Sequence, residues 1–293
     1  MCAAAGAAAA PWITDSRALY GQGTLTAQAI VDRIQQNSSG EWKADTVDTF
    51  KAGDPSTRVT GIVTTAMATI PVLRQAVQTG ANLIITAEPS FYSKGDSSTP
   101  AVGRGGAAAA PDPVFAAKND FIKTNKLVIW RFSDHWRQRT PDPLAIGMTD
   151  ALGWSAFRTA DNPALLNVPV TTLDNLVSDI KKKLNARGGI RVVGDPLLKV
   201  QRIGLLPGTT AIQAALKLLP QVDAIVAGEV REWESVEYVR DKVTAGEKKS
   251  LVLVGRVVSE NTGMNECARW LKTLIPEVPT RWISVDDPYW RPA

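Results

Sequence analysis

The sequence predicts an α/β fold, in which helices alternate with the strands of mostly parallel sheets. Short apolar runs alternate with amphipathic segments along most of the chain, at the spacing typical of α/β layers. Hydrophobic residues make up 44% of the 293 residues and charged residues 21%, which is the composition of a folded globular protein. The chain shows no heptads and no repeat with a period of roughly 20–50 residues, which excludes solenoids and propellers. This length suits one large domain or two small ones.

The first series of elements ends near residue 152. Ile30 and Ile34 share a helical face behind a cap at Thr26. A later helix carries Pro71 in its first turn, and Gly80 stands at its predicted end. Strands are expected over 59–64, 82–86 and 127–131, and helices over 69–79, 112–125 and 143–152.

A second series begins with a helix over 172–185. Leu173, Leu176 and Ile180 share one face of it, and Gly188 follows its end. The run Pro207-Gly-Thr-Thr210 is predicted to open a helix, where backbone N–H groups serve as a simple cap or bind an anion. Further strands are expected over 190–193, 200–206, 224–227, 251–254 and 282–285, and helices over 209–218, 231–244 and 263–273.

Two low-complexity segments flank these elements. Residues 1–24 form an N-terminal tail whose first eleven residues are mostly alanine. They are interpreted either as an idle tail, which leaves a cytoplasmic location as the default, or as the remnant of a signal peptide, which implies export. The loop over 93–113 follows a strand end, so it is either a lid or an idle insertion. No apolar run approaches the length that a membrane span needs.

Composition and missing motifs exclude several function classes. A formal charge of +4 is too weak to indicate a nucleic-acid or anionic-membrane partner. A single histidine, His135, excludes any mechanism that needs two histidines from this chain. Cys2 and Cys267 cannot form a disulfide framework. Phosphate-binding P-loops, dinucleotide fingerprints after a strand and zinc-finger spacings are all absent.

Charged side chains follow the predicted strand ends, where α/β sheets usually bind ligands. Glu88 follows the strand over 82–86, and Asp134 and His135 follow the strand over 127–131. Glu229 follows the strand over 224–227, and Glu260 follows the strand over 251–254. Each also has a structural explanation: Glu88 could be a loop carboxylate paired with a lysine, and His135 a satisfied, half-buried side chain.

The ordered motifs resemble those of the NIF-three-like family, whose members are also described as dinuclear-metal-centre proteins or type 2 GTP cyclohydrolase I homologues. The resemblance runs from about Leu25 to Trp290. Its five motifs lie, in order, at 50–55, 80–92, 131–136, 228–234 and 255–264.

The resemblance implies a domain over 25–293 made of two facing α/β lobes that meet near 155–190. It also implies a cleft between the lobes that holds two metal ions, and a ring-like homo-oligomer. Hydrolase activity, including ring opening of the GTP cyclohydrolase type, is attributed to some members, and the family's function is otherwise poorly settled.

This sequence departs from the family pattern at the metal site. Ala87 stands where the first motif usually has a histidine, and Ser133 and Arg137 stand where one branch has histidines. Arg256 stands in place of another, next to Gly255. Because zinc and iron sites depend on nitrogen or sulfur ligands, these changes leave a site depleted for those metals.

Two hypotheses follow, and the sequence alone leaves it open whether the chain is an enzyme. In the first, a hydrolase retains a divalent metal (Zn, Fe, Mn or Mg) on Glu88, Asp134, His135 and Glu260, with Glu260 and His135 catalytic. In the second, a binding or scaffold protein has lost the metal, and Arg256 pairs with these carboxylates or holds an anionic or nucleotide-like small molecule. The lost imidazoles favour the second hypothesis.

Overall fold

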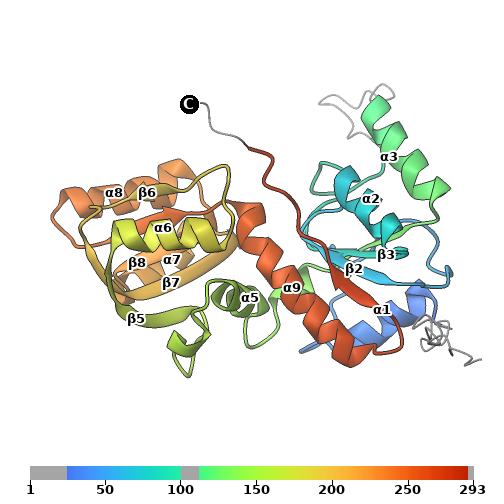
Figure 1. Cartoon of the computed structure of the whole chain (residues 1–293), viewed down its shortest axis with the longest axis horizontal. Coiled ribbons are helices and arrows are strands. Elements are labelled where there is room, and N and C mark those ends of the chain that lie inside the picture. Colours follow the sequence, from blue (N-terminus) through green and yellow to red (C-terminus); the bar gives the residue numbers. More distant parts are fainter. Residues whose placement is uncertain (1–24, 100–111, 290–293) are drawn as a thin grey trace, which may run out of the picture.

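The computed structural model describes residues 25–99 and 112–289 and contains two lobes, each built on a five-stranded sheet (Figure 1). The predicted tail over 1–24 and most of the predicted loop over 93–113 lie outside the described residues. Among the described helices, none is long and apolar enough to cross a membrane.

The sheet of the first lobe has the strand order β1-β4-β3-β2-β10. Four of its strands are parallel, and β1 is antiparallel at one edge. Because β10 comes from the end of the chain and pairs with β2, the first lobe contains segments from both ends of the described sequence. The strands are β1 (Phe50–Ala52), β2 (Ile62–Thr65), β3 (Leu83–Thr86), β4 (Val128–Arg131) and β10 (Thr280–Trp282).

Helices cover both faces of this sheet. Alternate strand residues point to opposite faces, so Ile62 and Ile85 pack with α1 and α9, whereas Val63 and Ile84 pack with α2 and α3. Burial on both faces explains why these strands are continuous apolar runs. The helices are α1 (Ala27–Gln36), α2 (Ile70–Gln78), α3 (Pro113–Thr124) and α9 (Arg256–Leu274).

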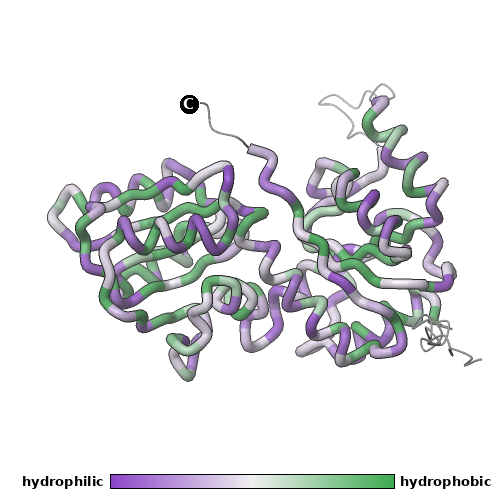
Figure 2. The backbone as a smooth tube through the Cα atoms, viewed as in Figure 1, coloured by the Kyte–Doolittle hydropathy of each residue, from purple (hydrophilic) through white to green (hydrophobic). Residues whose placement is uncertain are grey.

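The second lobe repeats this plan with the strand order β5-β7-β8-β9-β6. Its three central strands are parallel and its two edge strands are antiparallel. In both lobes the hydrophobic residues gather along the strands (Figure 2). The strands are β5 (Leu165–Thr172), β6 (Arg191–Val193), β7 (Lys199–Thr209), β8 (Ala224–Glu229) and β9 (Ser250–Leu253). The helices are α6 (Leu173–Lys183), α7 (Ile212–Leu218) and α8 (Glu237–Thr244), with short 3-10 turns at Ser155–Phe157 and Leu219–Gln221 and a π-helical turn at Glu232–Val236.

Two helices join the lobes. Helix α9 begins next to the end of β9 in the second lobe and ends against the first sheet (Figure 1). Helix α5 (Pro143–Ala151) packs across it with almost no space between the backbones, because a Cβ atom at Gly147 would lie 2.2 Å from the carbonyl oxygen of Thr262. The hydroxyl of Thr64 donates to the carbonyl of Met264 at 2.7 Å and fixes α9 on β2. This crossing sets the position of one lobe relative to the other.

Most predicted elements are present, with three kinds of difference. The predicted helix start at 207–210 is wrong, because β7 continues through a bulge to Thr209, which pairs with Glu229, and α7 begins only at Ile212. Helix α9 begins seven residues earlier than the predicted 263. Among the described strands and α-helices, three are absent from the prediction: β1, β5, which contains Pro169, and the single helical turn α4 (Asp134–Arg137).

Candidate functional site

Four charged side chains from three segments meet at the carboxyl ends of the strands, where the two lobes face each other. Glu88 lies two residues beyond β3, and Arg137 ends the short helix α4 that follows β4. Arg256 is the first residue of α9, and Glu260 lies one turn later on the same helix. We call these four residues the ionic network.

The arginines of the network each contact both carboxylates. Arg137 Nη2 donates to Glu88 Oε1 at 3.1 Å and also to Glu260 Oε1. Arg256 Nη2 donates to Glu88 Oε2 at 2.5 Å, and its Nε lies 3.5 Å from Glu260 Oε1. The carboxylates are buried, whereas the side chains of Arg137 and Arg256 remain 29% and 38% exposed. The network therefore places two permanent cations against two buried acids.

Burial and charge together set the protonation of Glu260. Burial of its side chain and the neighbouring Glu88 carboxylate outweigh the two arginines and raise the pKa of Glu260 to about 7. Burial alone would lower the pKa of Arg256, but its hydrogen bond to Glu88 and the charges of Glu88, Glu260 and Glu229 raise it. The network thus sets two guanidinium groups against two carboxylates, of which Glu260 titrates near neutral pH.

The end of β7 packs against the network. Gly208 has a φ of +78°, and a Cβ atom there would lie 2.7 Å from both Arg137 Nη1 and Glu260 Oε1. Its N–H donates to Ser259 Oγ at 2.9 Å. A side chain at this position would displace the network, so only glycine fits here.

The predicted ligand His135 is fully engaged elsewhere. Its Nδ1 lies 2.8 Å from Asp48 Oδ2, and its Nε2 accepts the backbone N–H of Lys43 at 3.0 Å. This pattern indicates a neutral ring protonated on Nδ1. The ring also stacks on Trp42, with centroids 3.6 Å apart, and is 1% exposed. His135 thus has no free nitrogen for a metal ion or a substrate.

Asp134 is also bound to neighbouring groups. Its Oδ2 accepts the Thr46 hydroxyl at 2.9 Å and the Val47 N–H at 3.1 Å. Asp48, which sequence reasoning missed, caps α4 by accepting the N–H groups of Ser133, Asp134 and His135 at 2.6–3.0 Å. These contacts hold the turn that carries Arg137 into the network.

Of the predicted site residues, the structure brings together Glu88, Arg256 and Glu260. The arginine that completes the network, Arg137, has one signal in the sequence: it stands where one branch of the family has a histidine. This signal is enough to place Arg137 in the ionic network, because a position equivalent to a metal ligand should lie at the same site. Gly208 has no such signal in the sequence, because its role depends on the close approach of β7 to the network.

The network does not fit the metal centre that the resemblance implies. Within the two described ranges, no group of three or more His, Cys, Asp or Glu side chains is placed to hold a metal ion. The carboxylates of Glu88 and Glu260 instead face Arg137 and Arg256, so a metal ion bound by them would lie beside two permanent cations. We therefore derive no reaction step through a metal.

A cavity of about 550 Å³ adjoins the network and shares Arg256 with it. It is lined by the ends of β8 and β9, the first turn of α9 and the C-terminal segment near Asp287. Gly255 is the N-cap of α9, so no side chain caps the free N–H groups of its first turn. We call this space the α9 pocket.

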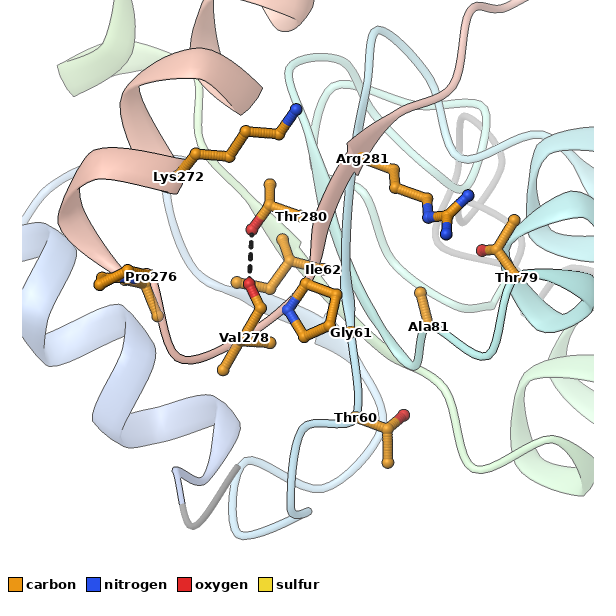
Figure 3. A pocket seen from close by; sticks show the side chains of 12 residues that line it. Thr60, Gly61, Ile62, Thr79, Ala81, Lys272, Pro276, Val278, Thr280 and Arg281 are labelled. Carbon is orange, nitrogen blue, oxygen red and sulfur yellow. Dashed lines mark hydrogen bonds between the residues drawn. The ribbon is translucent and has the colours of Figure 1, made fainter. Parts of the chain in front are cut away.

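A larger cavity of about 680 Å³ lies at the opposite edge of the first sheet (Figure 3). It is lined by the residues that precede β2, β3 and β10, with Lys272 and Arg281 above it. Parallel α/β sheets bind ligands at the carboxyl ends of their strands, and this cavity lies at the amino ends. We therefore take the α9 pocket and the ionic network as the candidate site.

Solved structures share this architecture, whereas no family model and no curated protein matches the sequence. A hypothetical protein of Staphylococcus aureus is 14% identical over 91% of this chain and 99% of its own, with a TM-score of 0.67. A Bacillus cereus protein related to NIF3 is 13% identical over 90% of this chain and 98% of its own, with a TM-score of 0.66. The protein ybgI, of unknown function, is 19% identical over 90% of this chain and 100% of its own, with a TM-score of 0.65.

These likenesses show the fold: the chain has the two-lobed α/β architecture of NIF3-related proteins. The fold that the ordered sequence motifs predicted is therefore confirmed. A shared fold at these identities leaves the activity to be argued from the site itself.

Proposed function

We propose that this chain, which has the NIF3-like fold, is a binding protein whose ionic network takes the place of a metal centre. The observation that supports this most strongly is the position of Arg137 and Arg256 between Glu88 and Glu260. Two guanidinium groups supply the positive charge that buried carboxylates require. On this proposal, they hold the facing lobes together without a metal ion.

The α9 pocket would receive the anionic part of a small molecule. Arg256 presents a partly exposed guanidinium there, which can bind a phosphate or carboxylate through two hydrogen bonds. The uncapped first turn of the 19-residue helix α9 adds N–H donors and the positive end of its dipole. The volume of about 550 Å³ is within the usual range for small-molecule pockets.

The hydrolase hypothesis is less well supported by the geometry. The pKa of Glu260, about 7, would suit a general acid or base. However, its side chain is 1% exposed and bound by Arg137, and His135 has both nitrogens occupied. Neither residue lines the α9 pocket, so neither is placed to act on a molecule bound there. The homo-oligomer implied by the resemblance remains a prediction.

Arg256→Gln tests the proposal. Titration calorimetry with inorganic phosphate and pyrophosphate should detect binding to the full chain, and Arg256→Gln should weaken it about tenfold or more, because one charge-assisted contact is lost. Arg33→Gln, which removes an exposed pair with Glu277 in the first lobe, is the control and should leave the affinity unchanged. Thermal melting verifies that each variant is folded. Equal affinities for wild type and Arg256→Gln, or no binding of either anion at millimolar concentration, would contradict the proposal.

A further inference from the structure

The α9 pocket carries charges of both signs. Arg191 and Arg256 line it together with the carboxylates of Glu229 and Asp287. Glu229 is the last residue of β8 and is exposed, and its Oε2 accepts the Thr209 hydroxyl at 3.2 Å. Its charge is one of those that raise the pKa of Arg256, so the two groups lie within electrostatic range.

The second carboxylate is fixed by backbone contacts. Asp287 Oδ2 accepts the N–H of Gly188 at 2.6 Å, and its Oδ1 accepts the N–H of Tyr289 at 3.1 Å. No described arginine or lysine forms an ion pair with Asp287 or Glu229. A ligand in the pocket would therefore meet two carboxylates that no described arginine or lysine pairs with.

The cations of the pocket are already largely balanced. Arg256 pairs with Glu88 and lies close to Glu260, and Arg191 Nη1 lies 2.6 Å from Glu232 Oε1. A simple anion would gain contacts at the first turn of α9 but would be repelled by Glu229 and Asp287. A positive group on the same ligand would turn that repulsion into attraction.

We propose that the ligand of the α9 pocket is zwitterionic, with its anionic group at Arg256 and the start of α9 and its ammonium-type group against Glu229 and Asp287. This inference rests on the proposed function, because it assumes that the anion lies at the start of α9. It adds the chemical class of the ligand, namely a small phosphate or carboxylate compound that also carries a cation. Specificity would come from repulsion of plain anions as well as from attraction.

Matched probes test this inference. O-phosphoethanolamine carries both charges, whereas ethyl phosphate has the same phosphate group and two-carbon chain and lacks the ammonium group. Calorimetry on the full-length wild-type chain should show about tenfold tighter binding of O-phosphoethanolamine, the change expected for one added charge-assisted contact. Glu229→Gln should move the two affinities in opposite directions, with tighter binding of ethyl phosphate and weaker binding of O-phosphoethanolamine. Glu247→Gln, which removes a carboxylate on the turn after α8, should change neither.

The outcomes separate this inference from the function on which it rests. Equal wild-type affinities for the two probes, or the same shift for both in Glu229→Gln, would overturn the zwitterion while leaving anion binding intact. Binding of ethanolamine as tight as that of O-phosphoethanolamine would also overturn it, because the phosphate would then contribute nothing. If neither phosphate compound binds, the proposed function itself fails.

Discussion

Replacing Glu88 by alanine should lower the free energy of unfolding by about 2–4 kcal/mol, measured by urea denaturation at neutral pH. Glu88 is buried and accepts hydrogen bonds from both Arg137 and Arg256, so its removal leaves two cations with only Glu260 between them. Removal of one partner from a fully buried pair costs roughly 3–5 kcal/mol, and the partial exposure of the arginines reduces that cost. A loss of this size is a large fraction of the stability of a typical domain.

The pH dependence of stability provides a second readout of the same substitution. The pKa of Glu260 is raised from 4.5 to about 7, so between these values the folded chain binds more protons than the unfolded chain. The contribution is fully present below pH 4.5 and is lost as the pH rises towards 7. Because the charge of Glu88 is one cause of this shift, Glu88→Ala should flatten the decline. Glu41→Ala, at an exposed carboxylate, is the control, and an equal loss in Glu41→Ala and Glu88→Ala would refute the role of the network.

Gly147→Ala should destabilise the chain by about 2–3 kcal/mol, measured in the same way. The new Cβ would lie 2.2 Å from the carbonyl oxygen of Thr262 and 2.9 Å from the nitrogen of Gly263, both in the backbone of α9. Helices α5 and α9 must move apart to accept it. Overpacking costs roughly 1–3 kcal/mol and occasionally more, and a clash with backbone atoms at this distance lies at or above the upper end of that range. The gain in helix propensity, about 1 kcal/mol, offsets only part of the cost.

A matched glycine separates this clash from a general effect of adding a methyl group. Nothing lies within 4 Å of a Cβ built on Gly95, so Gly95→Ala should change the stability by less than about 0.5 kcal/mol. Unchanged stability in Gly147→Ala would mean that the crossing of α5 and α9 is not as close as described.

The fold could be predicted from the sequence because its strands are buried on both faces. Runs such as 82–86 and 251–254 are short and continuously apolar, which makes them easy to recognise. β1 has only three residues and β5 contains Pro169, so neither shows that pattern. Helix α9 begins earlier than the sequence predicts, because Arg256, Ser259 and Glu260 make its first turns too polar to show the apolar periodicity of a helix.

The site could be predicted only in part, because its partners come from separate segments. Glu88 follows a strand of the first sheet, whereas Arg256 and Glu260 follow a strand of the second. Each is therefore expected at the carboxyl end of a sheet, but their proximity depends on how the two lobes face each other. The engagement of His135 depends on Asp48, Lys43 and Trp42, which lie about ninety residues earlier and form no recognisable motif. Hydrogen bonds and ring contacts between such distant residues can be recognised only when the tertiary structure is known.

Metal binding by the wild-type chain tests the central claim most directly. Full-length protein, treated with a chelator and then freed of it, is dialysed to equilibrium against Zn²⁺ and separately against Mn²⁺ at low micromolar concentration, and the metal per chain is counted. The ionic network predicts well below one equivalent of either ion, because Arg137 and Arg256 already neutralise the carboxylates that would bind it. One or two equivalents per chain, lost in Glu88→Ala, would contradict the account and restore the metal-dependent hydrolase.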